Sequence, residues 1–308
     1  MESEQQEYTT VKSAINIRAL TKNLNGAQLN IEKLSIPQSF STALIGENGA
    51  GKSSLLRILA GIDLDYNGEI KYFDNRQRET VIRELIGYTS PNNYFLQSLN
   101  IKSLGKSNQL LYDNFSSEKY YSLCKELGLT DFKKHILSFS DGMKMKTALA
   151  SVLARDTKLL LLDEPDSQLD PLMRDKLCSL IRDYLDDNNE EKTIFFSTHN
   201  IADMESVTDY AVIMARCEVV EQGFVEDLKE KYVLVKGEPA DAEKIKQHFI
   251  GFEQNSYGFE GICLSEKLDR LIGFDIAVET PTLSQISVAI MKKYTLSSET
   301  PSLSVNTI

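Results

Sequence analysis

The sequence predicts an α/β fold with a parallel sheet at its core and a smaller α+β extension near the C-terminal end. A glycine-rich segment, residues 46–53, follows a short apolar run and precedes a helical pattern, which is a strand–loop–helix unit. A second apolar run, residues 158–162, ends in a carboxylate, as a central strand covered on both faces does. After Gly223 a separate alternation of short strand and helix patterns begins.

Most of the elements predicted in the first hundred residues are strands. Alternating polar and apolar residues favour two antiparallel strands joined by a turn at residues 23–26, and this pair would form an antiparallel layer. The predicted strands cover residues 13–20, 27–36, 42–45, 68–73 and 85–88. A helix is expected over residues 54–60, and the segment that begins at Ser90 and Pro91 is loop by composition.

From residue 100 onward, helices and strands alternate. Apolar residues recur at three- and four-residue spacing in the helical segments, and Pro171 suits the first turn of its helix. The expected elements are a helical region over 100–128, a helix opening at 139–143, a strand at 158–163, a helix at 171–187, a strand at 193–197 and a hairpin at 209–214 and 217–221.

The C-terminal extension is expected to combine three strands with three helices. The strands cover residues 232–236, 261–264 and 274–278, and the helices cover 242–249, 265–272 and 282–293. Thr282 and Gln285 are spaced as a capping box. We therefore divide the chain into a frayed start (1–12), a core (13–225, with a helical part at about 90–155), an extension (226–295) and a Ser/Thr-rich flexible tail (296–308).

Composition narrows the function classes. The chain has 308 residues, a net charge of −11 and a pI of about 5.0, which argues against nucleic acid as the main partner. No apolar run reaches the roughly 18 residues of a membrane span, and the acidic start is not a secretory signal. We therefore expect a cytosolic protein whose four scattered cysteines are reduced and mostly buried.

The glycine-rich segment has the spacing of a phosphate-binding loop. Its residues are Gly46, Glu47, Asn48, Gly49, Ala50, Gly51, Lys52 and Ser53, followed by Ser54, which we include in the predicted nucleotide site. Glycines let the backbone point N–H groups inward, and the following helix N-terminus favours anions. Lys52 can then reach the β- and γ-phosphates of ATP, and Ser53 can bind Mg²⁺. The alternative is a glycine-rich turn that binds nothing.

Two consecutive acids, Asp163 and Glu164, follow the long apolar run. An acid at the carboxyl end of a strand beside a phosphate-binding loop can bind Mg²⁺, which makes Asp163 the candidate metal ligand with Ser53. The next acid, Glu164, can orient and polarise an attacking water as a general base. An exposed acidic turn is the alternative interpretation.

Together these segments resemble the ATP-binding-cassette (ABC) ATPase family. The resemblance rests on GENGAGKS (46–53), FSDGMKMK (139–146), LLLLDEP (159–165), SQLD (167–170) and STH (197–199), and covers roughly residues 13–225. It implies a P-loop NTPase core with a parallel sheet, an antiparallel β layer and a helical subdomain. The cofactors implied are ATP and Mg²⁺.

The family's mechanism implies roles for further residues. Two such domains pair head to tail, and each supplies a signature motif, here Ser140, Asp141 and Gly142, to the ATP of the other. His199 matches the switch histidine, which contacts the γ-phosphate and helps hold Glu164. Ser167 and Asp170 match the loop that crosses the dimer interface.

Three positions depart from the family pattern. Asp141 replaces a glycine and adds negative charge near phosphate, which would weaken closure of the dimer. The family usually has a glutamine after the strand at residues 85–88; residues 89–93 contain none, and Asn92 or Asn93 would substitute through a side-chain carbonyl. Leu24 stands where an aromatic residue usually stacks on adenine, so selectivity for the base would be loose.

We interpret the chain as the ATP-hydrolysing subunit of an exporter, at the inner face of the cell membrane. It would work with a separate transmembrane permease, a second ATPase subunit and no nucleic acid. The tail from Tyr232 and the segment Gly142 to Lys144 look like the bacitracin-resistance and peptide-toxin branch, although a generic α+β appendage fits the tail equally. The alternatives are a soluble ABC ATPase outside transport and a non-catalytic nucleotide-binding partner in a heterodimer.

Overall fold

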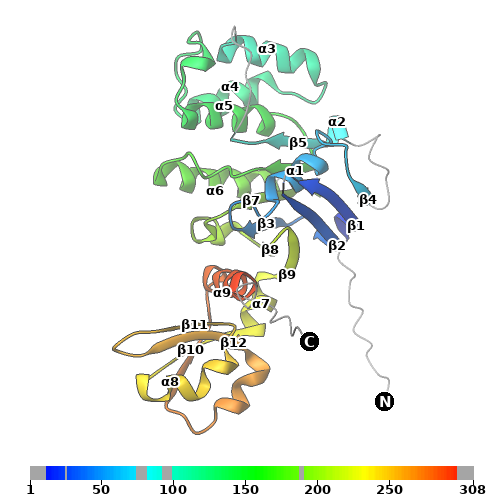
Figure 1. Ribbon diagram of the computed structural model, residues 1–308. Helices are drawn as coiled ribbons and strands as arrows, with labels where there is room; N and C mark the ends of the chain where they lie inside the picture. Colours follow the sequence, from blue (N-terminus) through cyan, green and yellow to red (C-terminus); the bar gives the residue numbers. More distant parts are fainter. Residues whose placement is uncertain (1–11, 25, 74–81, 92–98, 187–190, 297–308) are drawn as a thin grey trace, which may run out of the picture.

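The computed structural model describes residues 12–24, 26–73, 82–91, 99–186 and 191–296. The expectations for the chain's first eleven residues, for the tail after residue 296, and for Asn92 and Asn93 lie outside these ranges. The described chain forms a helical layer, a large sheet with helices against it, and a C-terminal unit beyond the sheet (Figure 1).

The larger sheet has nine strands among the described residues, in the order β4-β1-β2-β9-β8-β3-β7-β6-β5. They are β1 (Ser13–Leu24), β2 (Ala27–Pro37), β3 (Ser41–Gly46), β4 (Asn67–Tyr72), β5 (Ile86–Thr89), β6 (Leu159–Leu162), β7 (Thr193–Thr198), β8 (Tyr210–Ala215) and β9 (Glu218–Phe224). The strands β1, β2 and β4 pair antiparallel, which confirms the predicted antiparallel layer. The pairs β8–β3, β3–β7, β7–β6 and β6–β5 are parallel, which confirms the predicted parallel core.

The parallel core brings the ends of three strands to one edge. Every residue of β3, β6 and β7 is buried, as their continuous apolar sequences require. In register, Ile45 at the end of β3 lies beside Thr198, and Leu162 lies beside Phe196. The segments that leave these strands, which contain Gly46, Asp163 and His199, therefore start side by side.

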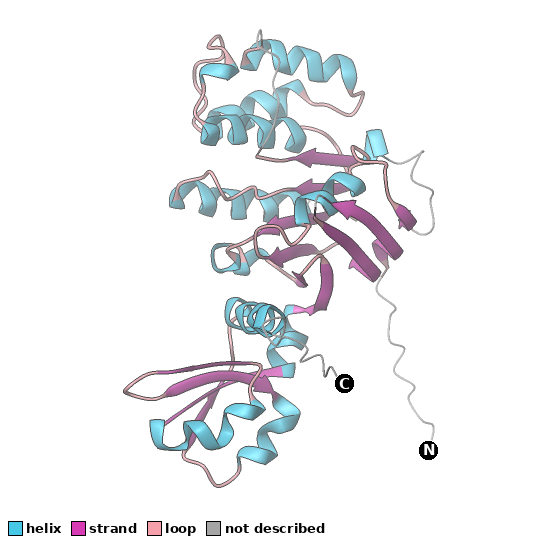
Figure 2. Ribbon diagram, in the orientation of Figure 1, coloured by secondary structure: helices cyan, strands magenta, loops and turns pink. Residues whose placement is uncertain are grey.

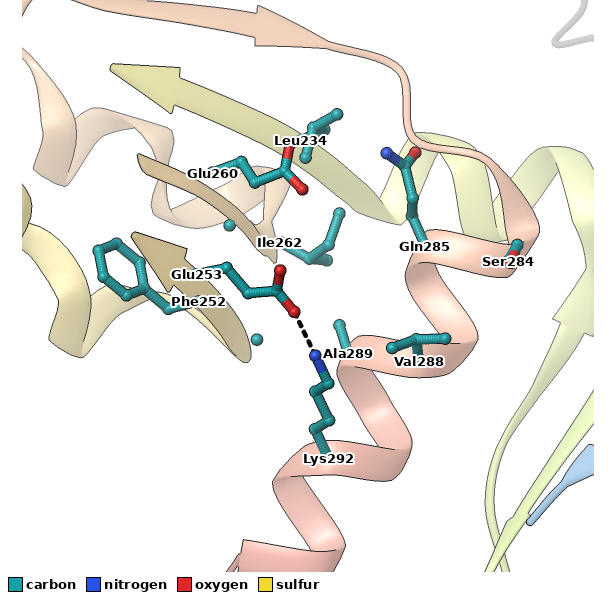
Figure 3. A pocket seen from close by; sticks show the side chains of 12 residues that line it. Leu234, Phe252, Glu253, Glu260, Ile262, Ser284, Gln285, Val288, Ala289 and Lys292 are labelled. Atoms are coloured by element: carbon teal, nitrogen blue, oxygen red, sulfur yellow. Dashed lines mark hydrogen bonds and ion pairs between the residues drawn. The ribbon is translucent and has the colours of Figure 1, made fainter. Parts of the chain in front are cut away.

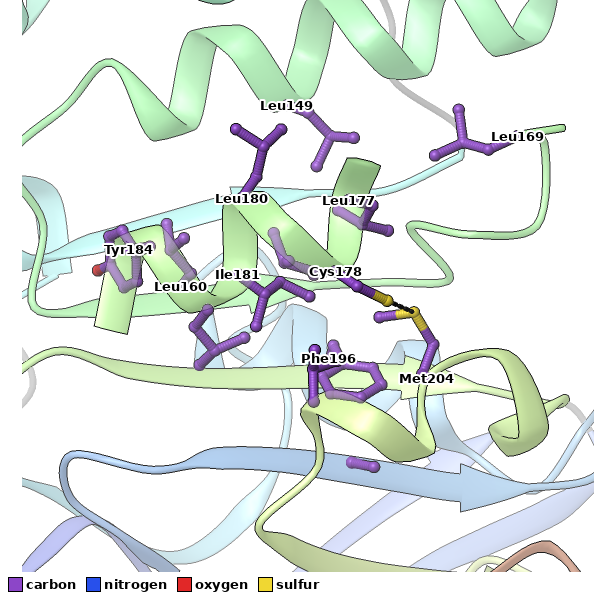
Figure 4. Close-up of a cluster of buried hydrophobic side chains, with 14 of the residues drawn as sticks. Leu149, Leu160, Leu169, Leu177, Cys178, Leu180, Ile181, Tyr184, Phe196 and Met204 are labelled. Atoms are coloured by element: carbon purple, nitrogen blue, oxygen red, sulfur yellow. Dashed lines mark hydrogen bonds between the residues drawn. The ribbon is translucent and has the colours of Figure 1, made fainter. Parts of the chain in front are cut away.

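Helices cover this sheet and form a layer beside it (Figure 2). They are α1 (Lys52–Leu59), α2 (Ile82–Leu85), α3 (Ile101–Leu111), α4 (Ser117–Glu126), α5 (Asp141–Leu153) and α6 (Pro171–Leu185), with 3₁₀ turns at Ile136–Ser138, Ile201–Asp203 and Glu205–Val207. Helix α6 packs between α5 and strands β6 and β7 through Leu177, Leu180 and Ile181 (Figure 4). Because Asp170 is the N-cap of α6, this packing fixes the loop that precedes the helix.

The C-terminal unit is a second sheet with helices on both sides. Its strands, in the order β11-β12-β10-β13, are β10 (Tyr232–Gly237), β11 (Gly251–Gln254), β12 (Phe259–Leu264) and β13 (Ile276–Glu279). Its helices are α7 (Val225–Lys231), α8 (Pro239–Ile245) and α9 (Leu283–Leu296), with 3₁₀ turns at Lys246–His248 and Ser265–Leu271.

Helix α9 joins this unit to the larger sheet. Its buried residues Leu283, Ile286, Ala289 and Ile290 belong to the same apolar cluster as the core of the large sheet. The capping box is confirmed, because Gln285 N–H donates to Thr282 Oγ1 at 3.1 Å and Thr282 N–H donates to Gln285 Oε1 at 2.9 Å.

The other side of α9 borders a cavity of about 180 Å³ against β11 and β12 (Figure 3). Leu234, Ile262 and Val288 contribute apolar surface to it, and an ion pair between Glu253 and Lys292 lies along it.

The extension also holds the main differences from the sequence-based expectations. Strand β11 and helix α7 were not predicted, and residues 265–271 form a 3₁₀ helix where an α-helix was expected. At β11 the reason is contact with distant segments: Gly251 allows α9 to approach, since a Cβ there would lie 2.8 Å from the Cβ of Ala289. All four cysteines are free and buried, as expected. The proposed domain boundaries stay a prediction.

Candidate functional site

The loop between β3 and α1 has the backbone of an anion cradle. Gly49 and Gly51 adopt left-handed conformations with φ of 84° and 92°, which favour glycine because a Cβ would be strained there. Gly51 is the N-cap of α1, and Ala50 N–H donates to Glu47 O at 3.1 Å. The free N–H groups of the α1 N-terminus thus face the concave side of the loop, where phosphate can bind.

The Lys52 side chain lies inside this loop and bonds to its backbone. Its side chain is almost fully buried, and its Nζ donates to Gly46 O at 2.7 Å and to Glu47 O at 3.0 Å. Burial lowers the pKa of Lys52, while Glu164 and Asp163 oppose this change. A phosphate oxygen would replace neutral carbonyl partners with a charged one, which gives a stronger hydrogen bond.

A cavity of about 340 Å³ lies over the loop. Its lining residues are Leu24, Asn48, Gly49, Gly51, Lys52, Ser53, Ser54 and Glu164. The cavity therefore brings together most of the predicted phosphate-binding residues with Leu24, which stands at the end of β1. Leu24 offers an apolar wall at the place predicted for the base.

Asp163 follows β6 and points toward α1. Its Oδ1 accepts hydrogen bonds from Ser53 Oγ at 3.0 Å and from Ser197 Oγ at 2.6 Å. Burial raises the pKa of Asp163, and the two hydroxyl donors only partly offset this rise. A cation beside this carboxylate would remove the cost of its burial.

Glu164 lies between the loop and His199. Its backbone has a φ of 43°, which is uncommon for a residue with a side chain and marks local strain. The Glu164 N–H donates to Ser197 Oγ at 2.9 Å, and Glu164 Oε1 lies 3.6 Å from His199 Nδ1. The Glu164 side chain is 24% exposed and the His199 side chain 44%, so both are accessible to solvent, and Glu164 also lines the cavity over the loop.

The predicted signature residues lie elsewhere on the chain. Ser140 is the N-cap of α5, where its Oγ accepts from Met143 N–H at 3.3 Å. Asp141 is 72% exposed and forms an ion pair with Lys144 at 3.0 Å. None of Ser140, Asp141 and Gly142 lines the cavity over the loop, so within one chain the structure does not bring them to the phosphate cradle.

The two predicted dimer-loop residues take local partners. Ser167 Oγ donates to Glu164 O at 3.0 Å, and Asp170 Oδ1 accepts from Met173 N–H at 3.0 Å as the N-cap of α6. The carbonyl of Gln168, between them, lies so close to Gly142 that a Cβ there would be 2.7 Å from it. This loop therefore touches the signature helix of its own chain.

Comparisons with known proteins identify the family. A model of ABC transporter proteins matches residues 29–167, and a second model, for an AAA domain, matches residues 135–203. An energy-coupling factor transporter ATP-binding protein of Mycoplasma mobile is 31% identical over 216 residues, covering 67% of this chain and 77% of that protein. The chain belongs to the ABC transporter ATP-binding proteins.

Other relatives agree with this assignment. A protein of the same name from Mycoplasmopsis pulmonis is 29% identical, covering 79% of this chain and 96% of its own length. An uncharacterized ABC transporter ATP-binding protein of Bacillus subtilis is 34% identical, covering 61% and 63%. A solved ATP-binding subunit of an ABC transporter has a TM-score of 0.62 at 22% identity, covering 70% of this chain and 92% of that one, which shows the fold.

The chain is therefore an ABC ATPase that binds ATP. Among the helices of the described residues, none has the length and apolar character of a membrane span.

The residues present also fit a magnesium ion. The Ser53 hydroxyl and the buried Asp163 carboxylate offer oxygen ligands at one place, and Mg²⁺ needs only one or two protein oxygens when phosphates and waters complete its shell. Within the described residues there is no cluster of three or more side chains that could hold a metal without such help.

Sequence reasoning missed the role of Ser197. This hydroxyl, which is fully buried at the end of β7, joins Asp163 to the backbone of Glu164. A polar residue at the carboxyl end of a strand next to the phosphate loop was the available signal.

Proposed function

We propose that the chain is the ATP-hydrolysing subunit of an ABC exporter and powers a separate membrane-spanning subunit. The observation that carries the proposal is the meeting of Lys52, Asp163, Glu164 and His199 at one edge of the parallel core. A non-catalytic nucleotide-binding partner would not need this complete set.

In this proposal the phosphates of ATP bind the N–H groups of residues 47–53, and Lys52 exchanges its carbonyl partners for phosphate oxygens. Ser53 and Asp163 hold Mg²⁺, which would neutralise charge on the β- and γ-phosphates when bound. Leu24 contacts the base as an apolar wall without stacking.

Glu164 orients and polarises the attacking water, and His199 holds Glu164 and contacts the γ-phosphate. Support comes from the 3.6 Å separation of Glu164 Oε1 and His199 Nδ1 and from the strained backbone that aims Glu164. Ser140 and Gly142 of a second ATPase subunit, identical or different, would complete the site, because α5 presents them at an exposed N-terminus.

The exporter direction and the peptide or antibiotic cargo rest on the resemblance of the C-terminal segment and of the segment Gly142 to Lys144. Relatives named for energy-coupling factor transporters do not favour export. A bacterial Atm1-family ABC exporter shares the fold, with a TM-score of 0.59 at 19% identity over 70% of this chain and 40% of that one. In either direction, the membrane subunit would hold the chain at the inner face of the membrane.

Magnesium-dependent ATP turnover by the purified protein tests the proposal. Glu164→Gln is expected to lower turnover by about a hundredfold or more, because it removes the base, while ATP binding persists. Glu32→Gln, at an exposed position on β2, is the matched control and should turn over normally. Full turnover by Glu164→Gln would contradict the assigned base.

A pull-down in mild detergent tests the membrane partner. The expected result is a co-purifying membrane-spanning subunit, and vesicles containing both proteins would then report the direction of transport. ATP-driven uptake into vesicles with the ATPase outside corresponds to export from a cell, so the opposite movement would contradict the exporter.

A further inference from the structure

Asp166 is a buried carboxylate that no role proposed so far requires. It is 2% exposed, and its Oδ1 has no hydrogen-bond partner among the residues that the structure describes. Burial raises the pKa of Asp166, with His199 and Arg174 acting in the opposite direction. A buried polar atom without a partner costs stability, so the residue is not explained by stability alone.

The other oxygen of Asp166 contacts the loop that carries His199. Thr198 Oγ1 donates to Asp166 Oδ2 at 3.4 Å and accepts from Asn200 N–H at 3.0 Å. Thr198 is fully buried, whereas His199 is partly exposed. The hydroxyl of Thr198 thus holds both the backbone after His199 and the carboxyl of Asp166.

A chain of hydrogen bonds closes this contact into a ring. Asn200 Nδ2 and an Arg174 guanidinium nitrogen both donate to Asp203 Oδ2, at 2.9 and 2.6 Å, and Arg174 Nε donates to Asp166 O at 3.3 Å. The ring consists of Asp166, Thr198, Asn200, Asp203 and Arg174. It joins the segment after β6, the segment after β7, and α6.

The ring is adjacent in sequence to the two residues proposed to act in hydrolysis, Glu164 and His199. His199 lies between Thr198 and Asn200, and Asp166 lies two residues after Glu164. The next residue, Ser167, belongs to the loop proposed to face the second subunit, and its Oγ donates to Glu164 O. Moving Asp166 would therefore shift both the His199 loop and the backbone that sets Glu164.

We propose that Asp166 is a positioning residue for ATP hydrolysis: through Thr198 it holds the His199 loop against the segment of Glu164 and Ser167. Asp166 does not line the cavity over the phosphate loop, so no contact with nucleotide is assigned to it. The proposal rests on the proposed roles of Glu164 and His199 and adds a residue to them.

Steady-state kinetics of Asp166→Ala test the proposal. Turnover (kcat) is expected to fall about tenfold or more, since small misplacements of reacting groups are costly, with the Kd of a non-hydrolysable ATP analogue changed less than twofold. Asp166→Asn keeps an acceptor oxygen for Thr198 and should restore most of the turnover. Thr198→Val should lose at least as much turnover as Asp166→Ala, because it removes the same contact and also the acceptor for Asn200 N–H, and the double variant should be no worse than Thr198→Val alone.

A control separates positioning from a purely structural effect. Asp209→Ala removes a comparable carboxylate acceptor, because Asp209, at an exposed position, accepts through Oδ2 from Ser41 N–H at 2.9 Å at the start of β3, the end of this strand that lies away from the phosphate loop. This variant should lose thermal stability and keep its turnover per folded molecule. Asp166→Ala should show the reverse, with a melting temperature at or above that of the unchanged protein, since it removes an unpartnered buried oxygen.

Unchanged kcat in Asp166→Ala, or a loss of kcat that Asp166→Asn does not restore, would overturn the proposal. Amide hydrogen exchange at Asn200 gives a readout without turnover, and Asp166→Ala should accelerate it at least tenfold in nucleotide-free protein. If the unchanged protein has no ATPase activity, the proposed function fails, and this exchange experiment still decides whether Asp166 holds the His199 loop.

Discussion

The two groups of residues proposed to clamp ATP differ sharply within one chain. The phosphate loop is closed on itself: Lys52 is buried on two loop carbonyls, and Ser53 is bonded to a buried Asp163. The signature end of α5 is open, because Ser140 and Asp141 are exposed and Ser140 bonds only within its own helix turn.

This difference indicates how ATP binding and turnover are divided between two subunits. A buried cradle is already organised before nucleotide arrives, and it needs little change to bind phosphate. An exposed helix N-terminus has unsatisfied N–H groups that await an acceptor. The loop half is therefore expected to determine ATP binding by a single chain, and the signature half to act only after two chains meet.

The largest expected effect comes from Lys52→Ala. This change removes the only charged donor inside the loop cavity, so the affinity for ATP should fall about a hundredfold, in keeping with a lost charge-assisted hydrogen bond of 1.5–3 kcal/mol. Isothermal calorimetry on the single chain measures it. Lys33→Ala, at an exposed position on β2, should bind ATP normally; equal losses in both variants would contradict the importance of the buried lysine.

Ser140→Ala should have the next largest effect, and on turnover alone. It removes one hydroxyl donor from the facing site, so turnover should fall about tenfold to a hundredfold, whereas ATP binding by the single chain should not change. Mixing this variant with Lys52→Ala tests the comparison directly, since half of random dimers would contain one intact site, giving about a quarter of full turnover. No recovery in the mixture would contradict a site shared between chains.

A smaller effect is expected from Asp141→Asn. Lys144 already neutralises part of the Asp141 charge, so ATP-driven dimerisation should strengthen only about two- to threefold at low salt and not at all at high salt. Analytical ultracentrifugation measures it. Glu118→Gln, in the first turn of α4, is the matched control; the same gain there would assign the effect to net charge.

A modest gain, in affinity for ATP rather than in dimerisation, is expected from Leu24→Tyr. An aromatic ring at this wall of the cavity would stack on adenine and gain about 0.5–1.5 kcal/mol, or two- to tenfold in affinity for ATP. Leu64→Tyr, at an exposed position, should change nothing. An unchanged affinity in Leu24→Tyr would show that the base does not lie against this residue.

The core of this fold was predictable because its signals are local. The short apolar runs at 42–45, 158–162 and 193–197 favour buried strands, and they contain β3, β6 (from Leu159) and β7 or parts of them. Motif spacing then predicted that Ser53, Asp163 and Glu164 would meet, and their side chains do lie together. The capping box at Thr282 was equally local and equally clear.

What escaped prediction depends on contacts between distant segments. Nothing in the sequence around Asp166 indicates that Thr198 and Arg174 surround it, because those partners come from β7 and α6. Strand β11 is short and begins with glycine, so its pairing with β12 decides its structure more than its own propensity does. The bridging role of Ser197 likewise exists only once β6 and β7 are adjacent.

Helix α9 connects the C-terminal extension directly to the segment that follows His199. Its first N–H group, that of Leu283, donates to Glu205 Oε1 at 3.0 Å, six residues beyond His199, and its apolar side packs on the 3₁₀ turn that starts at Ile201. Outward displacement of α9 would remove a hydrogen-bond donor from Glu205 and would expose the 3₁₀ turn that follows His199. Removing residues 226–308 would thus leave an unstable enzyme rather than a minimal one.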